Sequence, residues 1–196
     1  MSDRRRRKRE RGAALTEFAL VAPVLVLVAV GIAEFGLAWR DSMTVSTALR
    51  SGARVAANEG SDRLADHQAL LALDAGLAEL PGTSIERVVV FNAGTDAEPA
   101  QACKDGTPSA ATGRQCNVYD AGDLDRPAAD FAGTTTCAVT APDRYWCPLD
   151  RDDDQSGTLD TLGVWVRIRH DWITGLFPGG GLTMEDTTVM RLEPGT

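Results

Sequence analysis

The sequence predicts an α+β fold in which one long N-terminal helix packs on a small antiparallel sheet of three or four strands. Three observations support this prediction. An almost unbroken apolar run extends from Leu15 to Trp39, three later segments show strand-like alternation, and a polar region between the first two of these holds all four cysteines. A length of 196 residues suits one ordinary domain plus an anchor. We therefore expect a single folded core.

The charge of the chain is strongly polarised. The formal net charge is -8, yet residues 1–12 hold seven Arg or Lys against Asp3 and Glu10, so this segment is +5 and the remainder is -13. Nucleic acid, anionic lipid and membrane-topology signals all use such basic clusters. Because an apolar run follows directly, we interpret the cluster as a topology signal and expect no nucleic acid partner.

The apolar run is long enough to cross a bilayer. As a helix, its 25 residues span about 37 Å, against a hydrocarbon core of about 30 Å. Flanking Arg and Lys residues stay on the cytoplasmic side. We therefore expect a single-pass chain in membrane lipid, with its N-terminus cytoplasmic and its C-terminal domain extracytoplasmic. A cleaved secretory signal and a buried core helix fit less well, because the run is long and no clear Ala-x-Ala site follows it.

Two residues within the run predict local features. Pro23 removes a backbone donor and should kink the helix. Glu34 lies two-thirds of the way along, where it would either reach the outer headgroup region or pair with another helix inside the membrane, and we favour the first. Trp39 suits the interface between lipid and water.

Helical periodicity continues beyond the span. It predicts a stem that ends near Gly60, with small residues at Ala48, Gly52 and Ala56 that allow another element to approach closely. We favour packing on the chain's own domain over packing on another subunit. A second helix is expected from about Asp62 to Leu80, stopped by Pro81-Gly82.

The strand-like segments are Ile85 to Asn92, Gly163 to Trp172 and Thr183 to Leu192. The last two should form a hairpin, because the connection between them is rich in glycine and proline. The stem helix should lie across one face of the resulting sheet.

A long acidic segment, residues 93–162, carries the cysteines. An even number of cysteines outside the cytoplasm indicates disulfides. The four are Cys103, Cys116, Cys137 and Cys147. Of the three possible pairings we favour the sequence-local one, first with second and third with fourth. Zinc is disfavoured because the segment has no Cys-x-x-Cys pair.

The same segment contains oxygen-bearing residues at calcium-loop spacing. They are Asp152, Asp154, Ser156, Thr158 and Asp160. The usual twelfth-position acid is replaced by Gly163, so an ordinary solvated loop is at least as good an interpretation. No cofactor is required, and calcium is the one metal that the pattern suggests.

Glu17 lies just inside the apolar run, where a carboxylate is costly without a partner. The unit formed by a basic tail, Gly12, Ala13, Glu17 and Phe18 resembles a type IV prepilin-like leader. The resemblance implies that a prepilin peptidase cuts after Gly12 and frees the amino group of Ala13, which Glu17 of one subunit can then neutralise on the next.

Four stretches resemble the TadE-like pseudopilins of the tight-adherence (Tad) pilus assembly system. They are residues 11–23, 31–36, 48–57 and 182–194. The resemblance implies a minor pilin-like subunit in a bacterial cell membrane, a pilin-like fold, and other Tad pilins and assembly proteins as partners. Phe18 stands where related Tad prepilins often have Tyr.

The expected organisation is a basic leader (1–12), a membrane span (13–40), a helical stem (41–60) and an extracytoplasmic domain (61–196). The sequence has no phosphate-binding loop or zinc-protease signature, so we expect neither an enzyme nor a small-molecule substrate. An uncleaved, signal-anchored binding domain that uses calcium is the main alternative to pilus assembly. A secreted hydrolase would require a mature protein without the apolar segment.

Overall fold

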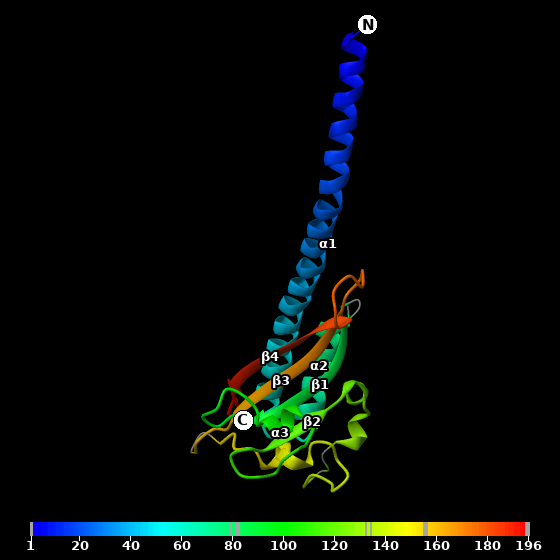
Figure 1. The fold of residues 1–196 in the computed structure, drawn as a ribbon. Helices are drawn as coiled ribbons and strands as arrows, with labels where there is room; N and C mark the ends of the chain where they lie inside the picture. Colours follow the sequence, from blue (N-terminus) through cyan, green and yellow to red (C-terminus); the bar gives the residue numbers. More distant parts are fainter. Residues whose placement is uncertain are drawn as a thin grey trace.

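The computed structural model describes residues 2–78, 80, 83–131, 133, 135–154 and 157–194, with side chains described from Leu15 onward. A single long helix, α1 (Ser2–Glu59), projects from an α+β domain and forms part of that domain with its C-terminal half (Figure 1). This arrangement confirms the predicted fold class.

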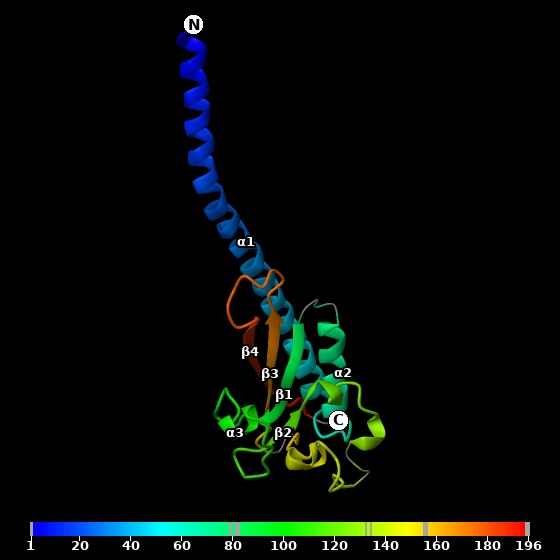
Figure 2. The ribbon, with the colours of Figure 1, turned by 45° about the vertical axis from the view of Figure 1, so that its right-hand side comes forward.

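Helix α1 joins the apolar run to the stem without interruption. It continues through Pro23, and Figure 2 shows a gradual curve rather than a local break. The helix ends where predicted, because Gly60 adopts a φ of 51°, a conformation that glycine reaches at little cost.

The sheet has four antiparallel strands in the order β2-β1-β3-β4. Their bounds are β1 Thr83–Asn92, β2 Cys116–Tyr119, β3 Thr161–Asp171 and β4 Gly181–Arg191. The three predicted strands are confirmed to within about two residues, and β3 and β4 form the expected hairpin. The fourth strand, β2, is a short edge strand inside the cysteine-bearing segment.

Helix α2 (Ala65–Leu77) packs beside the stem of α1, and the two helices cover the same face of the sheet (Figure 2). Small residues make this close packing possible. A Cβ placed on Gly76 would lie 2.6 Å from the Cβ of Ala48, and one on Gly52 would lie 3.1 Å from the carbonyl oxygen of Ala69. The small-residue ladder of the stem therefore contacts the chain's own α2. The expected stop at Pro81-Gly82 lies outside the described residues.

Each face of the sheet has an apolar cluster. The larger one joins the stem and α2 to the inner face of β1 and β3, around residues such as Leu49, Leu73, Val90 and Ile168. The smaller one, on the opposite face, surrounds Trp165. There the Phe91 ring fills the space that a side chain at Gly163 would occupy.

The segment between β1 and β3 contains, besides β2, one short α-helix and four 3-10 turns. They are α3 (Gln101–Lys104), η1 (Ala121–Asp123), η2 (Ala128–Asp130), η3 (Arg144–Trp146) and η4 (Pro148–Asp150). Two disulfides join Cys103 to Cys116 and Cys137 to Cys147. These are the pairs that the sequence favoured.

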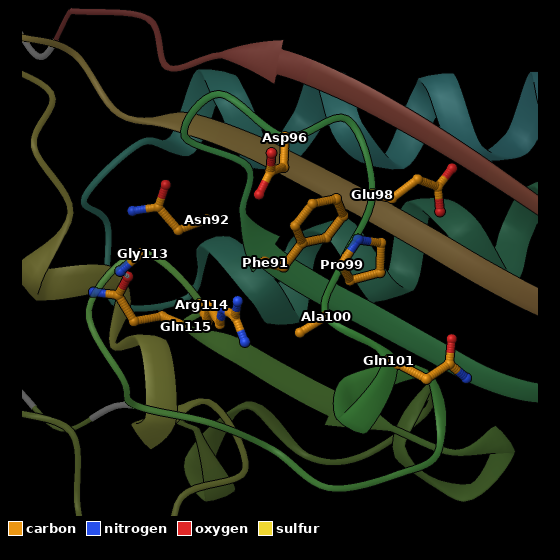
Figure 3. Close-up of a pocket in the computed structure, with 10 residues that line it drawn as sticks. All are labelled: Phe91, Asn92, Asp96, Glu98, Pro99, Ala100, Gln101, Gly113, Arg114 and Gln115. Carbon is orange, nitrogen blue, oxygen red and sulfur yellow. Dashed lines mark hydrogen bonds between the residues drawn. The ribbon is translucent and has the colours of Figure 1, made fainter.

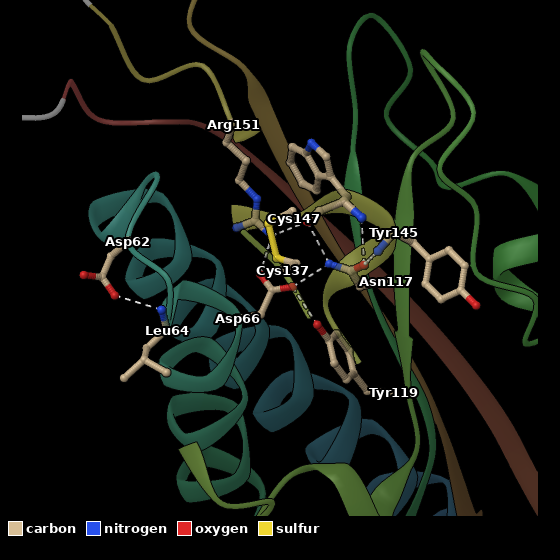
Figure 4. Close-up of polar contacts among 10 residues, drawn as sticks. Asp62, Leu64, Asp66, Asn117, Tyr119, Cys137, Tyr145, Cys147 and Arg151 are labelled. Carbon is tan, nitrogen blue, oxygen red and sulfur yellow. Dashed lines mark hydrogen bonds and ion pairs between the residues drawn. A yellow bond between two sulfur atoms is a disulfide. The ribbon is translucent and has the colours of Figure 1, made fainter. Parts of the chain in front are cut away.

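A buried polar cluster attaches this segment to α2 (Figure 4). Asp66 of α2 forms an ion pair with Arg151, and both side chains are fully buried. The Tyr119 hydroxyl donates to Asp66 at 2.6 Å, and the Asn117 amide donates to Asp66 at 2.8 Å and to the Trp146 carbonyl at 2.9 Å. Burial, reinforced by the Asp66 carboxylate, raises the pKa of Tyr119 well above its ordinary value, so the phenol stays protonated as a donor.

The cluster predicts that Asp66→Asn destabilises the domain by about 3–5 kcal/mol, because the substitution leaves the Arg151 charge buried and unpaired. Urea unfolding of the full chain in detergent, followed by tryptophan fluorescence, measures this loss. Asp171→Asn is the matched control, since the exposed Asp171–Arg169 pair should contribute about 0–1 kcal/mol. Equal effects of the two substitutions would contradict the structural role of the cluster.

Candidate membrane anchor and assembly site

The N-terminal half of α1 exposes its apolar side chains on all sides. Of the described residues, Leu15–Glu59 forms one helix long and apolar enough to cross a membrane. Its exposed large side chains are Leu15, Phe18, Leu20, Val21, Val24, Leu25, Val26, Leu27, Val28 and Ile32. A soluble monomer rarely leaves so much contiguous apolar surface uncovered, so this half of the helix requires lipid or other helices.

The predicted processing residues lie at the far end of this exposed rod. The backbone of Gly12 and Ala13 is part of α1, and their side-chain surroundings are outside the description. Glu17 and Phe18 are exposed. Within the part of the chain that the structure describes, Glu17 makes no hydrogen bond or ion pair. Its carboxylate is thus available to a partner outside the described residues.

Glu34 has hydrogen-bond partners that the sequence did not suggest. We expected a headgroup contact or a partner helix, but the Glu34 carboxylate is buried against the chain's own β3–β4 loop. It accepts hydrogen bonds from the backbone N–H of Ile173 at 3.1 Å, from the N–H of Thr174 at 2.7 Å and from the Thr174 hydroxyl at 2.6 Å. A carboxylate with three donors needs no further cation. The sequence did not reveal these donors because they lie 139 and 140 residues away, and the headgroup level of Glu34 stays a prediction.

Three further polar contacts, made by two residues of α1, hold the stem on the sheet below Glu34. Asp41 is buried and accepts from the Thr83 hydroxyl at 3.0 Å, and its other neighbour is the His170 Nδ1 at 2.7 Å. One turn further along, the Ser46 hydroxyl donates to Asp186 of β4. Carboxylates on the stem and on the sheet therefore fix the rotation of α1 about its own axis. Sequence patterns did not reveal these pairs.

Two of the carboxylates at calcium-loop spacing accept hydrogen bonds from the backbone of their own loop. Asp160 accepts from the Asp152 backbone N–H at 3.0 Å, and Asp152 accepts from the Asp154 N–H at 3.2 Å, so these carboxylates bond to the loop itself. Among the described residues, no group of three or more His, Cys, Asp or Glu side chains could hold a metal. Ser156 lies outside the described residues, and the role of Thr158 is untested.

A polar hollow of about 270 Å³ lies at the end of β1 (Figure 3). Its wall includes Asn92, Asp96, Glu98, Arg114 and Gln115. Although burial opposes ionisation of Glu98, hydrogen bonds from Lys104 and Thr187 prevail and lower its pKa. The residues that line the hollow include no nucleophile paired with a base, so its chemistry is that of a polar surface.

The fold and this helix define a membrane-anchored α+β protein with an exposed N-terminal apolar rod. A family model described as TadE-like protein matches residues 12–54, which confirms the resemblance for the span and most of the stem. The match begins at Gly12 and includes Glu17 and Glu34, whereas the resembling stretch at 182–194 lies outside it. No curated protein matches the chain, and no solved structure matches it either.

The Glu34 contacts predict that Glu34→Ala releases the β3–β4 loop from α1. Amide exchange at Ile173 and Thr174 should rise about tenfold or more, because charge-assisted hydrogen bonds to both amides are lost. Hydrogen–deuterium exchange of a peptide from this loop measures the change. Glu59→Ala, an exposed substitution at the other end of the same helix, is the control. Unaltered exchange in the Glu34 variant would show that the contact does not hold the loop.

Proposed function

We propose that this chain is a minor pilin-like subunit for assembly of a Tad or type IV-like pilus, matured by a prepilin peptidase that cuts between Gly12 and Ala13. The observation that carries the proposal is the exposed apolar half of α1, with Glu17 lacking a partner in the described chain. The TadE-like match over the same residues supports it.

The chemistry of assembly follows from the position of Glu17. Cleavage after Gly12 removes the basic leader and creates an ammonium group at Ala13, four residues before the carboxylate. Neither charge is stable alone in lipid. In a bundle of such helices, the ammonium of one subunit and Glu17 of its neighbour neutralise each other. Assembly thus relieves a penalty that the single subunit carries, which favours the bundle over the monomer.

The proposed topology has residues 1–12 in the cytoplasm, residues 13–40 in the membrane, the stem at 41–60, and the domain at 61–196 on the extracytoplasmic side. The basic leader favours this orientation. The two disulfides in the domain also favour it, since such bonds persist in oxidising compartments. The partners are membrane lipid, the peptidase and sister pilins, and the role requires no catalysis.

Processing predicts an N-terminus at Ala13 in protein isolated from membranes of cells that contain the peptidase. Intact-mass and N-terminal peptide mass spectrometry identify it. In cells that lack the peptidase, the same protein should retain the leader. An intact Met1, or its methionine-trimmed form, in the first cells would contradict the proposal and would favour an uncleaved, signal-anchored binding domain.

Glu17→Gln should leave the folded domain intact and reduce co-purification with sister pilins at least about tenfold, because it removes the charge that neutralises the neighbouring ammonium. Quantitative pull-down from membranes, together with a count of surface fibres, measures the effect. Glu59→Gln makes the same chemical change at an exposed position of α1 outside the predicted span and should have no effect. If the Glu17→Gln variant leaves both the pull-down and the fibre count unchanged, the carboxylate does not have this role in assembly.

A further inference from the structure

The β3–β4 loop, residues 172–180, lies against α1 at the end of the domain that faces the apolar half of the helix. Both views show this orange loop pointing along α1 towards its N-terminus (Figures 1 and 2). Three aromatic rings join the loop to the helix. The ring centroid of Phe35 lies 5.6 Å from that of Trp172 and 5.5 Å from that of Phe177. The ring centroids of Trp172 and Phe177 are 5.3 Å apart.

The height of this contact along the helix coincides with the predicted edge of the bilayer. Counting from Leu15 at about 1.5 Å per residue, a hydrocarbon core of about 30 Å ends near Phe35. The Phe177 ring reaches further and would lie 3.6 Å from a Cβ at Gly31. The loop therefore reaches the level at which lipid headgroups meet acyl chains.

The side chains of the loop suit that level. Residues 172–184 include no charged side chain, in a chain of which 24% is charged. Ile173 is 72% exposed and Leu176 is 61% exposed, although both are large and apolar. On α1 itself, Trp39 is exposed close to the same height, where amphipathic aromatic residues are enriched in membrane proteins.

Glu34 supplies hydrogen-bond acceptors for backbone N–H groups of the loop, which an irregular loop needs at a membrane. Backbone N–H groups without partners are costly in lipid. The Glu34 carboxylate accepts from the N–H groups of Ile173 and Thr174, which lie at the start of the exposed apolar stretch. The same contacts keep the loop at a fixed height on the helix.

We propose that the β3–β4 loop is a second membrane anchor, which inserts Ile173 and Leu176 into the outer boundary of the bilayer beside the spanning helix. The occupant of this surface is lipid, because the loop is continuous with the surface of α1 that must already be in the membrane. Two points of attachment would hold the domain at one orientation to the membrane before assembly. This inference depends on the membrane span and not on a role in a pilus.

The test places an environment-sensitive fluorophore on the loop of the full chain in phospholipid vesicles. All four native cysteines are in disulfides, so Ile173→Cys supplies a single free thiol for labelling. Val139→Cys is the matched control, since Val139 is 87% exposed and belongs to the disulfide segment at the opposite end of the domain. A spin label attached near the headgroup of the lipid and a water-soluble ion serve as the two quenchers.

The label at position 173 should lose most of its fluorescence to the lipid-borne quencher and little to the soluble ion, with the reverse pattern at position 139. Leu176→Cys should behave like Ile173→Cys, which guards against a fold defect in either variant. The inference is overturned if the labels at 173 and 176 respond as the label at 139 does. It is also overturned if their protection disappears at high lipid-to-protein ratios, because a second copy of the chain would then be the occupant.

Discussion

One continuous helix, α1, lies in two different environments. The rest of the structure depends on where its apolar side chains change from exposed to buried. The N-terminal half of α1 exposes apolar side chains in every direction, whereas the C-terminal half buries Val45, Leu49 and Ala53 against α2 and the sheet. The change takes place within about two turns, between Glu34 and Asp41. At these two positions the helix has carboxylates, and the domain supplies their donors.

This junction determines how the domain is presented. Because Glu34, Asp41 and Ser46 bond to the hairpin, to β1 and to β4, the helix can neither rotate nor slide freely on the sheet. A subunit that packs through its apolar half would therefore place its domain at a defined angle to its neighbours. The disulfide segment lies at the opposite end of the domain and is held on α2 by the Asp66–Arg151 pair.

The features that were predictable from the sequence are those encoded by local periodicity. The span, the stem up to Gly60 and three of the four strands follow from hydrophobic patterns within single segments. The donors to Glu34 were not predicted because they are distant in sequence, although the uncharged loop after Asp171 was a usable signal. Asp66 also had a signal, since it precedes Leu70 and Leu73 on the buried face of α2. A charge on such a face requires a partner, but no local pattern identifies Arg151, 85 positions later. The calcium-like spacing stays a prediction, and the structure adds that Asp152 and Asp160 accept hydrogen bonds from backbone N–H groups of their own loop.

Thiol accessibility along α1 measures how the helix is divided between lipid and domain. Single cysteines at Leu27 and Thr47, both exposed positions, can be challenged with a membrane-impermeant maleimide on spheroplasts. We expect rapid labelling at Thr47→Cys and protection at Leu27→Cys, because the proposed topology puts only the first position in water outside the cell. Equal labelling at both positions, or labelling at Thr47→Cys only after lysis, would contradict it.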